Sequence, residues 1–276
     1  MSLGATPVRE ALDSAVVALT AASVDTPRLD AEVLLAHVLG VDRAALVIDR
    51  DRAVKGAAVR AFQDAVRRRA FDREPVAYIT GAKGFRHLEL QVDPRVLIPR
   101  PETETLVEAA VGILPQGARV VDVGTGSGAI ALALEDERAD LEVTGTDVSD
   151  DALEVARANA VRLGLDVAFA RADLLASVGE FDAVVSNPPY VEDGAELAPE
   201  IVRHEPSLAL RAGPEGLDVL RALVPAAAAL GDEVLAVEVG AGQAAAVEEL
   251  ARGAGFGRAE RRRDLAGVER VVIAWR

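Results

Sequence analysis

The sequence contains no cysteine, which excludes disulfide bonds and thiolate metal sites. Histidine is also scarce: His37, His87 and His204 are the only three, and no metal-ligand spacing links them. We therefore expect each histidine to be structural or exposed, and we expect no metal in the functional site.

Long apolar runs are missing as well. No stretch approaches the ~18 consecutive apolar residues that suggest a membrane span. The N-terminus lacks a basic stretch followed by an apolar core, which a secretory signal peptide requires. Internal repeats and low-complexity linkers are also absent. We therefore expect a soluble, cytoplasmic protein with no membrane partner.

The chain has 276 residues, of which half are hydrophobic, so we expect one large domain or two unequal ones. Its net charge of −15 is unevenly distributed. Residues 1–75 hold 11 basic and 11 acidic side chains, whereas the remaining residues hold 19 and 34. This acidic body is unsuited to direct binding of nucleic acid through phosphates, although it does not exclude a basic protein partner.

Residues 1–75 are predicted to form a small helical bundle. Thr6-Pro7 and Thr26-Pro27 each place an N-capping residue before a proline at the first helical position. Gly40 is expected to end the second helix, and a long helix is expected over about residues 53–70. The basic run Arg67-Arg68-Arg69 admits contact with RNA or an acidic partner, but a solvated helix end is the favoured interpretation.

The pattern changes after Pro75. Residues 88–92 alternate between apolar and polar, as a half-buried strand does, so residues 76–96 are predicted to form a β-hairpin linker. From residue 97 onward, predicted strands alternate with predicted helices. This alternation indicates an α/β domain with a mainly parallel sheet over residues 97–276.

A glycine-rich loop follows the first strand of this predicted domain. Residues 119–128 read Arg-Val-Val-Asp-Val-Gly-Thr-Gly-Ser-Gly, and glycines let a backbone turn sharply and lie against a ligand. With Ala129 as its sixth position, the loop matches the dinucleotide-binding pattern G-x-G-x-x-G/A. With Gly128, it matches the G-x-G-x-G of methyltransferases that use S-adenosylmethionine. Asp147, 23 residues past Gly124, suits the ribose of either cofactor.

The tetrapeptide Asn187-Pro188-Pro189-Tyr190 follows an apolar strand over residues 181–186. Two prolines end the strand, and ligands of open α/β sheets bind at the carboxyl ends of strands. Prolines lack an N–H and offer carbonyl oxygens, while Asn187 adds a side-chain oxygen. Two neighbouring acceptors suit a planar NH2 group, and Tyr190 offers a flat face for stacking.

Four interpretations are open here: a plain turn, a methyltransferase, an NAD-dependent oxidoreductase and a binding module with a dead site. Asn-Pro and Pro-Pro are common turn dipeptides, so a plain strand-ending turn is one reading. Methyl transfer to nitrogen uses paired acceptors around an NH2, whereas hydride transfer does not. The tetrapeptide therefore favours a methyltransferase, with an NAD-dependent oxidoreductase as the more distant alternative. A binding module with a dead site is disfavoured because every element of the site is intact.

Three motifs, taken in order, resemble the HemK/PrmC family of protein-glutamine N5-methyltransferases. They are Leu97-Ile-Pro-Arg-Pro-Glu-Thr-Glu104, Asp122-Val-Gly-Thr-Gly-Ser-Gly128 and Ser186-Asn-Pro-Pro-Tyr190. Asn-Pro-Pro-Tyr alone is shared with DNA and RNA amino-methyltransferases, but together with the first motif and later elements such as Glu205-Pro206 it is specific. The resemblance covers nearly the whole chain, although the helical N-terminal region matches in kind more than in residues.

The resemblance implies an activity and a fold. The family methylates the side-chain amide of the glutamine in the Gly-Gly-Gln motif of class-1 peptide chain release factors, with S-adenosylmethionine as methyl donor. A sister group acts on a glutamine of a ribosomal protein, which remains an alternative, as does an amino group of nucleic acid. The implied fold is a seven-stranded, Rossmann-like methyltransferase sheet with a reversed final strand, preceded by a helical substrate-docking domain.

The resemblance also assigns roles by position. The residues expected to hold the cofactor are Gly124, Thr125, Gly126, Ser127, Gly128, Asp147, Asp173, Leu174 and Asn187. Asn187 and the Pro188 carbonyl are expected to accept the two amide protons, with Pro189 and Tyr190 shaping the substrate pocket. The family often has an aromatic residue at the position of Leu174, so we expect an aliphatic face against the adenine here.

Overall fold

The computed structural model describes residues 5–176, 178–231 and 233–276, so the first four residues of the predicted helical bundle lie outside the described part. The chain divides into two compact units. The helical unit comprises Met1–Gly81 together with Leu197–His204, and the sheet unit comprises Ala82–Glu196 and Glu205–Arg276. Within the described ranges, no helix is long and apolar enough to cross a membrane.

The helical unit packs its helices around one apolar core. Its elements are β1 (Thr6–Pro7), α1 (Val8–Ala21), α2 (Pro27–Leu39), α3 (Arg43–Ile48), β2 (Ala53–Val54), α4 (Ala57–Arg67), the π-helical turn η1 (Arg68–Asp72) and α5 (Val76–Thr80). The helical unit extends to Gly81 because Val76 and Ile79 of α5 pack on this core.

Two predicted helix starts in this unit are wrong in detail. Thr6 and Pro7 pair with β2 as a short strand, and α1 begins at Val8 without a side-chain cap. The long helix predicted from residue 53 begins at Ala57, because residues 53 and 54 are taken up by that strand pair. The predicted stop at Gly40 is confirmed, since this glycine ends α2 with a left-handed φ of 61°.

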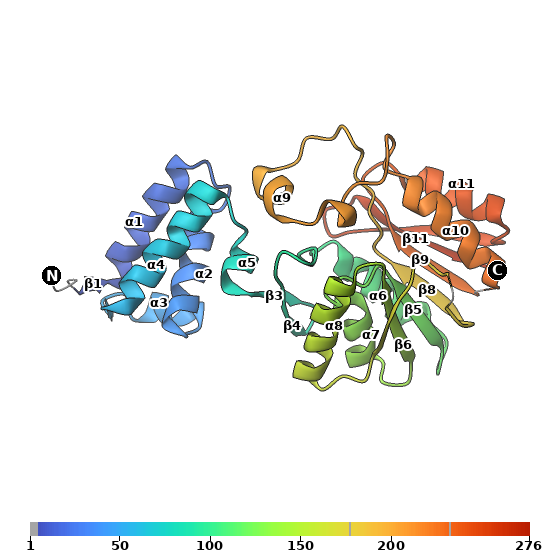
Figure 1. The fold of residues 1–276 in the computed structure, drawn as a ribbon, viewed down its shortest axis with the longest axis horizontal. Helices are drawn as coiled ribbons and strands as arrows, with labels where there is room; N and C mark the ends of the chain where they lie inside the picture. The colour runs from blue at the N-terminus through green and yellow to red at the C-terminus, as the bar shows by residue number, and fades with distance from the viewer. Residues whose placement is uncertain (1–4, 177, 232) are drawn as a thin grey trace. The chain divides into compact units, whose positions relative to one another are not determined.

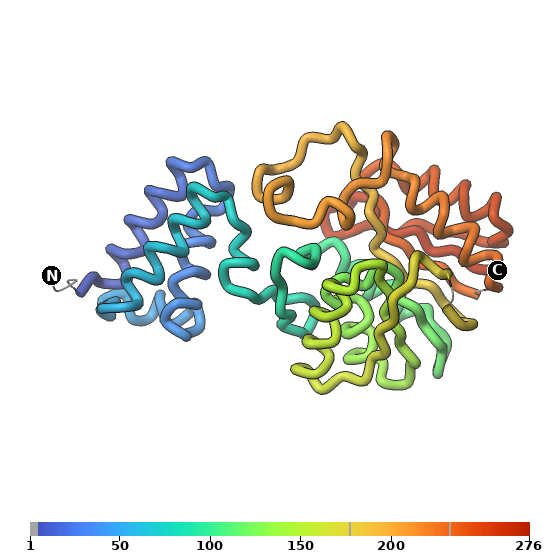
Figure 2. Tube along the Cα trace, viewed as in Figure 1, coloured from blue at the N-terminus to red at the C-terminus, as the bar shows by residue number. Residues whose placement is uncertain are grey.

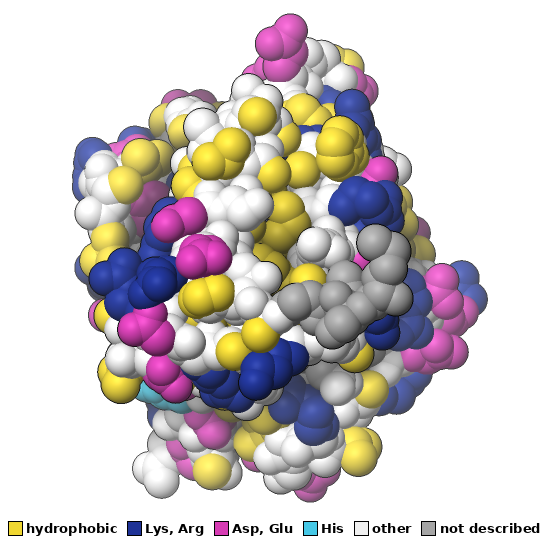
Figure 3. Space-filling view, turned by 90° about the vertical axis from the view of Figure 1, so that its left-hand side faces the viewer, with side chains coloured by type: hydrophobic (Ala, Val, Ile, Leu, Met, Phe, Trp, Pro, Cys, Tyr) yellow, Lys and Arg dark blue, Asp and Glu magenta, His cyan; other side chains and the backbone are white. Residues whose placement is uncertain are grey.

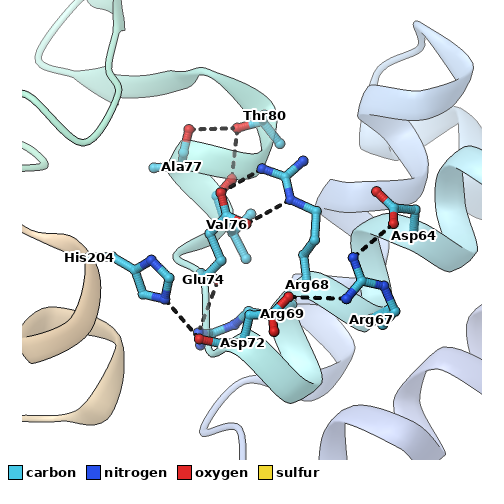
Figure 4. Close-up of polar contacts among 10 residues, drawn as sticks. All are labelled: Asp64, Arg67, Arg68, Arg69, Asp72, Glu74, Val76, Ala77, Thr80 and His204. Atoms are coloured by element: carbon cyan, nitrogen blue, oxygen red, sulfur yellow. Dashed lines mark hydrogen bonds and ion pairs between the residues drawn. The ribbon is translucent and has the colours of Figure 1, made fainter.

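Arginines 67 and 68 of the basic run are paired with carboxylates of their own helix end (Figure 4). Arg67 lies 3.1 Å from Asp64 and 3.2 Å from Asp72, with about half of its side chain exposed. Arg68 donates to both oxygens of Glu74, at 2.7 and 2.5 Å. These pairs leave the two arginines with internal partners, and on the face drawn in Figure 3 acidic and basic side chains lie interspersed.

Arg69, the third arginine of the run, is buried, so the predicted solvated helix end is wrong for this residue. Its Nε donates to Asp30 at 2.7 Å, and a second nitrogen donates to Glu200 at 3.1 Å. Glu200 also accepts from Arg73 at 2.8 Å. It lies on α9 (Pro199–His204), so this ion-pair cluster holds a distant segment of sequence in the helical unit.

The sheet unit is built on seven strands. They are β5 (Arg119–Val123), β6 (Glu142–Asp147), β7 (Ala168–Arg171), β8 (Ala183–Ser186), β9 (Val234–Glu238), β10 (Arg258–Arg263) and β11 (Glu269–Trp275). Their order is β10-β11-β9-β8-β5-β6-β7, and all neighbours are parallel except those involving β10 and β11. The predicted seven-stranded, mainly parallel sheet with a reversed final strand is confirmed.

Helices cover both faces of this sheet (Figure 1). Those on one face are α6 (Thr103–Ile113), α7 (Ala129–Glu137) and α8 (Asp150–Leu163), and those on the other are α10 (Asp218–Leu230) and α11 (Ala244–Ala254). Strand side chains alternate between the two cores, with Val120 in the first and Val121 in the second. A hairpin of β3 (Ala82–Phe85) and β4 (Leu88–Gln91) adds Phe85 and Leu90 to the first core.

Between β8 and α10 the chain follows a long, largely irregular path (Figure 2). It leaves the tetrapeptide, enters the helical unit as α9, and returns to the sheet unit at Glu205. A short 3-10 turn, η2 (Ser207–Ala209), follows. The connection that follows β8 therefore contains one segment, Leu197–His204, that belongs to the helical unit, while the residues on either side belong to the sheet unit.

The buried ion pair of Arg69 gives a stability prediction. Arg69→Met would leave the Asp30 carboxylate, 6% exposed, without its nearest cation. We expect a loss of about 3–5 kcal/mol in the free energy of unfolding of the helical unit. Arg67→Met is the matched control, because its pairs are exposed and contribute about 0–1 kcal/mol. Urea denaturation followed by circular dichroism checks this, and equal midpoints for the two variants would contradict it.

Candidate active site

The carboxyl ends of the parallel strands border a cavity of about 270 Å³ in the sheet unit. Eight of the twelve residues predicted for the site line it. They are Gly124, Gly126, Asp147, Asp173, Leu174, Asn187, Pro188 and Pro189. The structure therefore brings the glycine loop, the acidic residue and the tetrapeptide together at one place.

The glycine loop leaves open space toward the cavity. Gly124 and Gly126 have φ values of 73° and 55°, in the left-handed region that glycine adopts without strain. A Cβ atom on Gly124 would meet no atom within 4 Å, and one on Gly126 would meet only the Gly124 carbonyl oxygen, at 4.0 Å. Because both residues line the cavity, side chains here would fill the space that a ligand needs.

The other three loop residues support the loop from behind and do not line the cavity. Thr125 and Ser127 are buried, and the Thr125 hydroxyl donates to Asp122 at 2.6 Å. Gly128 is the N-cap of α7, and a Cβ atom there would lie 2.9 Å from the Cδ1 of Leu132. The absence of a side chain at Gly128 therefore permits α7 to pack closely on the loop. Because Thr125, Ser127 and Gly128 do not line the cavity, they would act on a cofactor only by holding the loop in shape.

Asp122 is a fully buried carboxyl beneath this loop, and sequence reasoning gave it no role. Its Oδ2 accepts from Thr125 and from the backbone N–H of Ala131, at 3.1 Å. Burial raises the pKa of Asp122 to about 7, which these two hydrogen bonds oppose. An acidic residue in an otherwise apolar strand is the sequence signal that marks it.

Asp147 at the end of β6 holds the loop and faces the cavity at the same time. Its Oδ2 accepts from the N–H of Gly126 at 3.0 Å, and its Oδ1 accepts from the N–H of Ser149 at 2.9 Å. Each of these two carboxylate oxygens can accept a further hydrogen bond, so Asp147 suits a ligand with two neighbouring hydroxyl groups.

Asp173 and Leu174 line the cavity beyond β7. Leu174 has a φ of 51°, which is uncommon for a residue with a side chain and places strain in the loop. Its side chain is partly buried against the second core and also lines the cavity, so the aliphatic face predicted to pack against the adenine is present in the lining.

The side-chain amide of Asn187 is held by one hydrogen bond. Its Nδ2 donates to the Thr103 hydroxyl oxygen at 3.0 Å, so the NH2 end of the amide is engaged with the protein. In the described part of the chain, neither Asn187 Oδ1 nor the Pro188 carbonyl oxygen accepts a hydrogen bond. Two acceptors therefore remain available in the cavity lining.

Tyr190 does not line the cavity, which differs from the flat stacking face expected of it. Its hydroxyl donates to Glu238 Oε1 at 3.1 Å, and burial together with this carboxyl raises the pKa of Tyr190. Its carbonyl oxygen accepts from Gln243 Nε2 at 3.1 Å. A Cβ atom on Gly216 would lie 2.2 Å from the same carbonyl oxygen, so only glycine fits there. These contacts lock the backbone of the tetrapeptide.

A further part of the cavity wall comes from the segment after α9. Pro206 and Leu208 line the cavity, and Glu205 beside them is buried. Glu205 accepts from Arg100 at 2.5 Å and from the N–H of Ile98 at 3.2 Å. This salt bridge fastens the segment to the proline-rich stretch before α6, a contact that joins residues over a hundred positions apart.

Comparison with known proteins establishes the family. Residues 10–81 match the family described as PrmC N-terminal domain, and residues 103–245 match the methyltransferase small domain. The chain is 42% identical to the release factor glutamine methyltransferase of Mycolicibacterium smegmatis over 98% of each chain. It is 44% identical to that of Deinococcus radiodurans, again over 98% of each chain. The chain belongs to the family of release factor glutamine methyltransferases.

The fold agrees with this family. A solved methyltransferase from Pyrococcus furiosus matches with a TM-score of 0.52 at 18% identity, over 68% of this chain and 88% of that one. The protein is an S-adenosylmethionine-dependent methyltransferase, which decides the ambiguity of the glycine loop against NAD. Two features of the site fit this cofactor. Space is open over Gly124 and Gly126, and both carboxylate oxygens of Asp147 can accept further hydrogen bonds.

Gly126 gives a prediction for cofactor binding. We expect Gly126→Val to abolish S-adenosylmethionine binding, because the side chain would enter the cavity and not the protein interior. Gly164→Val is the matched control: Gly164 ends α8 with a φ of 69° and has no atom within 4 Å of an added Cβ. Both variants carry a similar backbone strain of about 1–2 kcal/mol, so only the first should lose affinity. Isothermal titration calorimetry measures this, and unaltered affinity in Gly126→Val would refute it.

Proposed function

We propose that this protein transfers the methyl group of S-adenosylmethionine to the side-chain amide nitrogen of a glutamine in class-1 peptide chain release factors. The glutamine is that of the Gly-Gly-Gln motif. The observation that carries the proposal is the pair of open acceptors, Asn187 Oδ1 and the Pro188 carbonyl oxygen, in the cavity lining. The names of the relatives at 42% and 44% identity support the same substrate.

The residues of the chain would hold the cofactor on the side of the glycine loop. We assign Gly124 and Gly126 to its methionine part, Asp147 to the ribose, and Asp173 with Leu174 to the adenine. When bound, the cofactor supplies a sulfonium methyl carbon as the electrophile. Thr125, Ser127 and Gly128 act by keeping the loop in shape.

The contribution of the chain's own residues to the reaction comes from the two acceptors, Asn187 Oδ1 and the Pro188 carbonyl oxygen. An amide nitrogen is a poor nucleophile because its lone pair is delocalised into the carbonyl. Acceptors that hold both amide protons leave the lone pair directed out of the amide plane, and they stabilise positive charge as it develops on nitrogen. The methylated nitrogen is strongly acidic and loses its proton to water without a strong base. None of the three described histidines lines the cavity.

The substrate alternatives share the tetrapeptide but differ in their wider surroundings. A ribosomal-protein glutamine would present the same amide, and an amino group of nucleic acid would present the same two protons. The net charge of −15 opposes binding of nucleic acid through phosphates, so we propose no direct nucleic-acid partner. We further propose that the protein works in the cytoplasm, where release factors act.

We also propose that residues 1–75 dock the substrate and that residues 76–96 link them to the catalytic domain of residues 97–276. Removing residues 1–75 is not a clean test of docking. The deletion would also remove Arg69 and Arg73, the partners of Glu200, and free the segment that leads to the cavity wall. Substitutions of exposed side chains on the helical unit test docking without this loss, and they should raise KM for the intact release factor and spare cofactor affinity.

The substrate assignment is tested by incubating the full-length protein with labelled S-adenosylmethionine and a purified class-1 release factor. Mass mapping should find a single methyl group on the glutamine of the Gly-Gly-Gln motif. A release factor whose motif glutamine is replaced by alanine is the control and should remain unlabelled. Labelling of ribosomal protein or RNA in parallel reactions, with none on the release factor, would overturn the assignment.

Asn187→Ala removes one acceptor and leaves the two prolines in place. We expect kcat to fall roughly 10²–10³-fold, about 2.7–4 kcal/mol, by analogy with a deleted oxyanion-hole donor. Steady-state kinetics at saturating cofactor measure this, with cofactor affinity determined beside it. A near wild-type rate would remove Asn187 from the mechanism.

Asn187→Asp separates the acceptor from the donor of this side chain. Aspartate keeps an oxygen for the substrate but cannot donate to Thr103, whose hydroxyl now accepts from Asn187 Nδ2. We therefore expect Asn187→Asp to be as poor as Asn187→Ala in the same kinetic assay. Activity well above that of the alanine variant would show that acceptance from the substrate is the whole role of Asn187.

A further inference from the structure

Glu238 is a buried carboxyl directly beside the catalytic tetrapeptide. It is the last residue of β9, and the register pairs Val237 with Ser186 on the neighbouring parallel strand β8. Asn187 and Glu238 are therefore the next residues along two adjacent strands. Glu238 is 0% exposed, and a carboxyl is retained in such a place only when polar groups satisfy it.

Two hydroxyl groups lie near this carboxyl. Tyr190 donates to Oε1 at 3.1 Å, and the nearby Thr103 hydroxyl favours the charged carboxylate, which lowers the pKa of Glu238. Oε2 is buried and has no hydrogen-bond partner among the described residues. It therefore has the capacity to accept the Thr103 proton. Thr103 itself is 3% exposed at the start of α6.

The direction of the Thr103 proton determines what Asn187 can do. A hydroxyl carries one proton, so a threonine that donates to Glu238 can only accept from its other neighbour. The NH2 end of Asn187 is the end that donates, and it lies 3.0 Å from the Thr103 oxygen. The opposite amide orientation would set Asn187 Oδ1 against the lone pairs of Thr103.

We propose that Glu238 and Thr103 form a relay that orients the Asn187 amide, so that its oxygen and not its NH2 faces the substrate. Glu238 and Thr103 are thus positioning residues for methyl transfer, and Asn187 is the residue that touches the substrate. The relay rests on the proposed function, because it assumes that an amide NH2 is the group to be recognised.

The relay is sensitive to pH through Glu238. Burial raises the pKa of Glu238 to about 7, and nearby Glu102 raises it further, while Thr103, Tyr190 and Arg270 oppose the shift. The pKa of Tyr190 is raised, so its hydroxyl stays protonated and neutral near pH 7.

Above pH 7 the Glu238 carboxylate can only accept hydrogen bonds, and Thr103 must donate to it. Below pH 7 the protonated carboxyl can donate to Thr103, which frees the threonine proton and lets Asn187 turn. We expect kcat to fall as the pH drops through about 7.

The test uses paired substitutions at both relay positions. Thr103→Val removes the hydroxyl at nearly constant volume, and Thr103→Ser keeps it. Glu238→Gln keeps an acceptor for Tyr190 but turns a donor toward Thr103. We expect Thr103→Val and Glu238→Gln to lower kcat on a release factor about 10–100-fold, as seen for residues that orient metal ligands. Cofactor affinity should be unchanged, and Thr103→Ser should retain most of kcat.

Two controls separate the relay from general effects. Glu248→Gln replaces another buried glutamate of the sheet unit, which pairs with Arg252 and Arg261 and lies outside the cavity lining, and should leave kcat unchanged. The second control is the pH profile of Glu238→Gln. Asp122 also has a pKa of about 7, so the acid limb of the profile belongs to Glu238 only if it vanishes in this variant.

The outcomes distinguish the relay from the function on which it rests. If the wild type does not methylate the release factor, the proposed function fails. If the wild type is active and Thr103→Val keeps its kcat, the relay is overturned. Equal losses in Thr103→Val and Thr103→Ser would show that packing and not the hydroxyl matters, which also overturns it. Loss in Thr103→Val, retention in Thr103→Ser and a flat acid limb in Glu238→Gln support it.

Discussion

A side-chain amide can present either a donor or an acceptor to a substrate, and in this protein one hydrogen bond decides which. The NH2 group of Asn187 donates to Thr103, so the side-chain oxygen of Asn187 is the group that remains for the cavity. Beside it, the Pro188 carbonyl oxygen is a fixed acceptor, because proline offers no N–H. In the proposed mechanism, recognition of the planar NH2 group of the substrate depends on this arrangement, and the rest of the site keeps it in place.

The sheet supplies the rigid frame for that hydrogen bond. Parallel pairing of β8 with β9 brings Glu238 beside Asn187, and Gln243 with Gly216 holds the carbonyl oxygen of Tyr190. On the other side, β5 pairs with β8 and ends in the glycine loop. The glycine loop and the tetrapeptide, to which we assign the methyl donor and the substrate amide, thus follow neighbouring strands, so backbone pairing sets their relative position.

Much of this architecture was predictable from the sequence, because glycine permits sharp turns of the backbone and proline restricts it locally. Gly124, Gly126, Asp147 and the Asn-Pro-Pro motif all met at one cavity, and the sheet followed from alternating strands and helices. The charged edge strand β10 was not predicted, because its arginine-rich sequence lacks the alternation of apolar and polar residues that marks a strand. The roles of Thr103 and Glu238 were not predicted, because strand register brings Glu238 beside Asn187 and the packing of α6 brings Thr103 to it, and local patterns encode neither.

The most direct measurement is a crystal structure of the protein with S-adenosylhomocysteine and a peptide that contains the Gly-Gly-Gln motif. Our account predicts that the glutamine side-chain nitrogen lies about 2.7–3.2 Å from both Asn187 Oδ1 and the Pro188 carbonyl oxygen. It also predicts that Asn187 Nδ2 stays bonded to Thr103. A glutamine nitrogen bound elsewhere, or an Asn187 amide turned to present its NH2 to the peptide, would contradict the account.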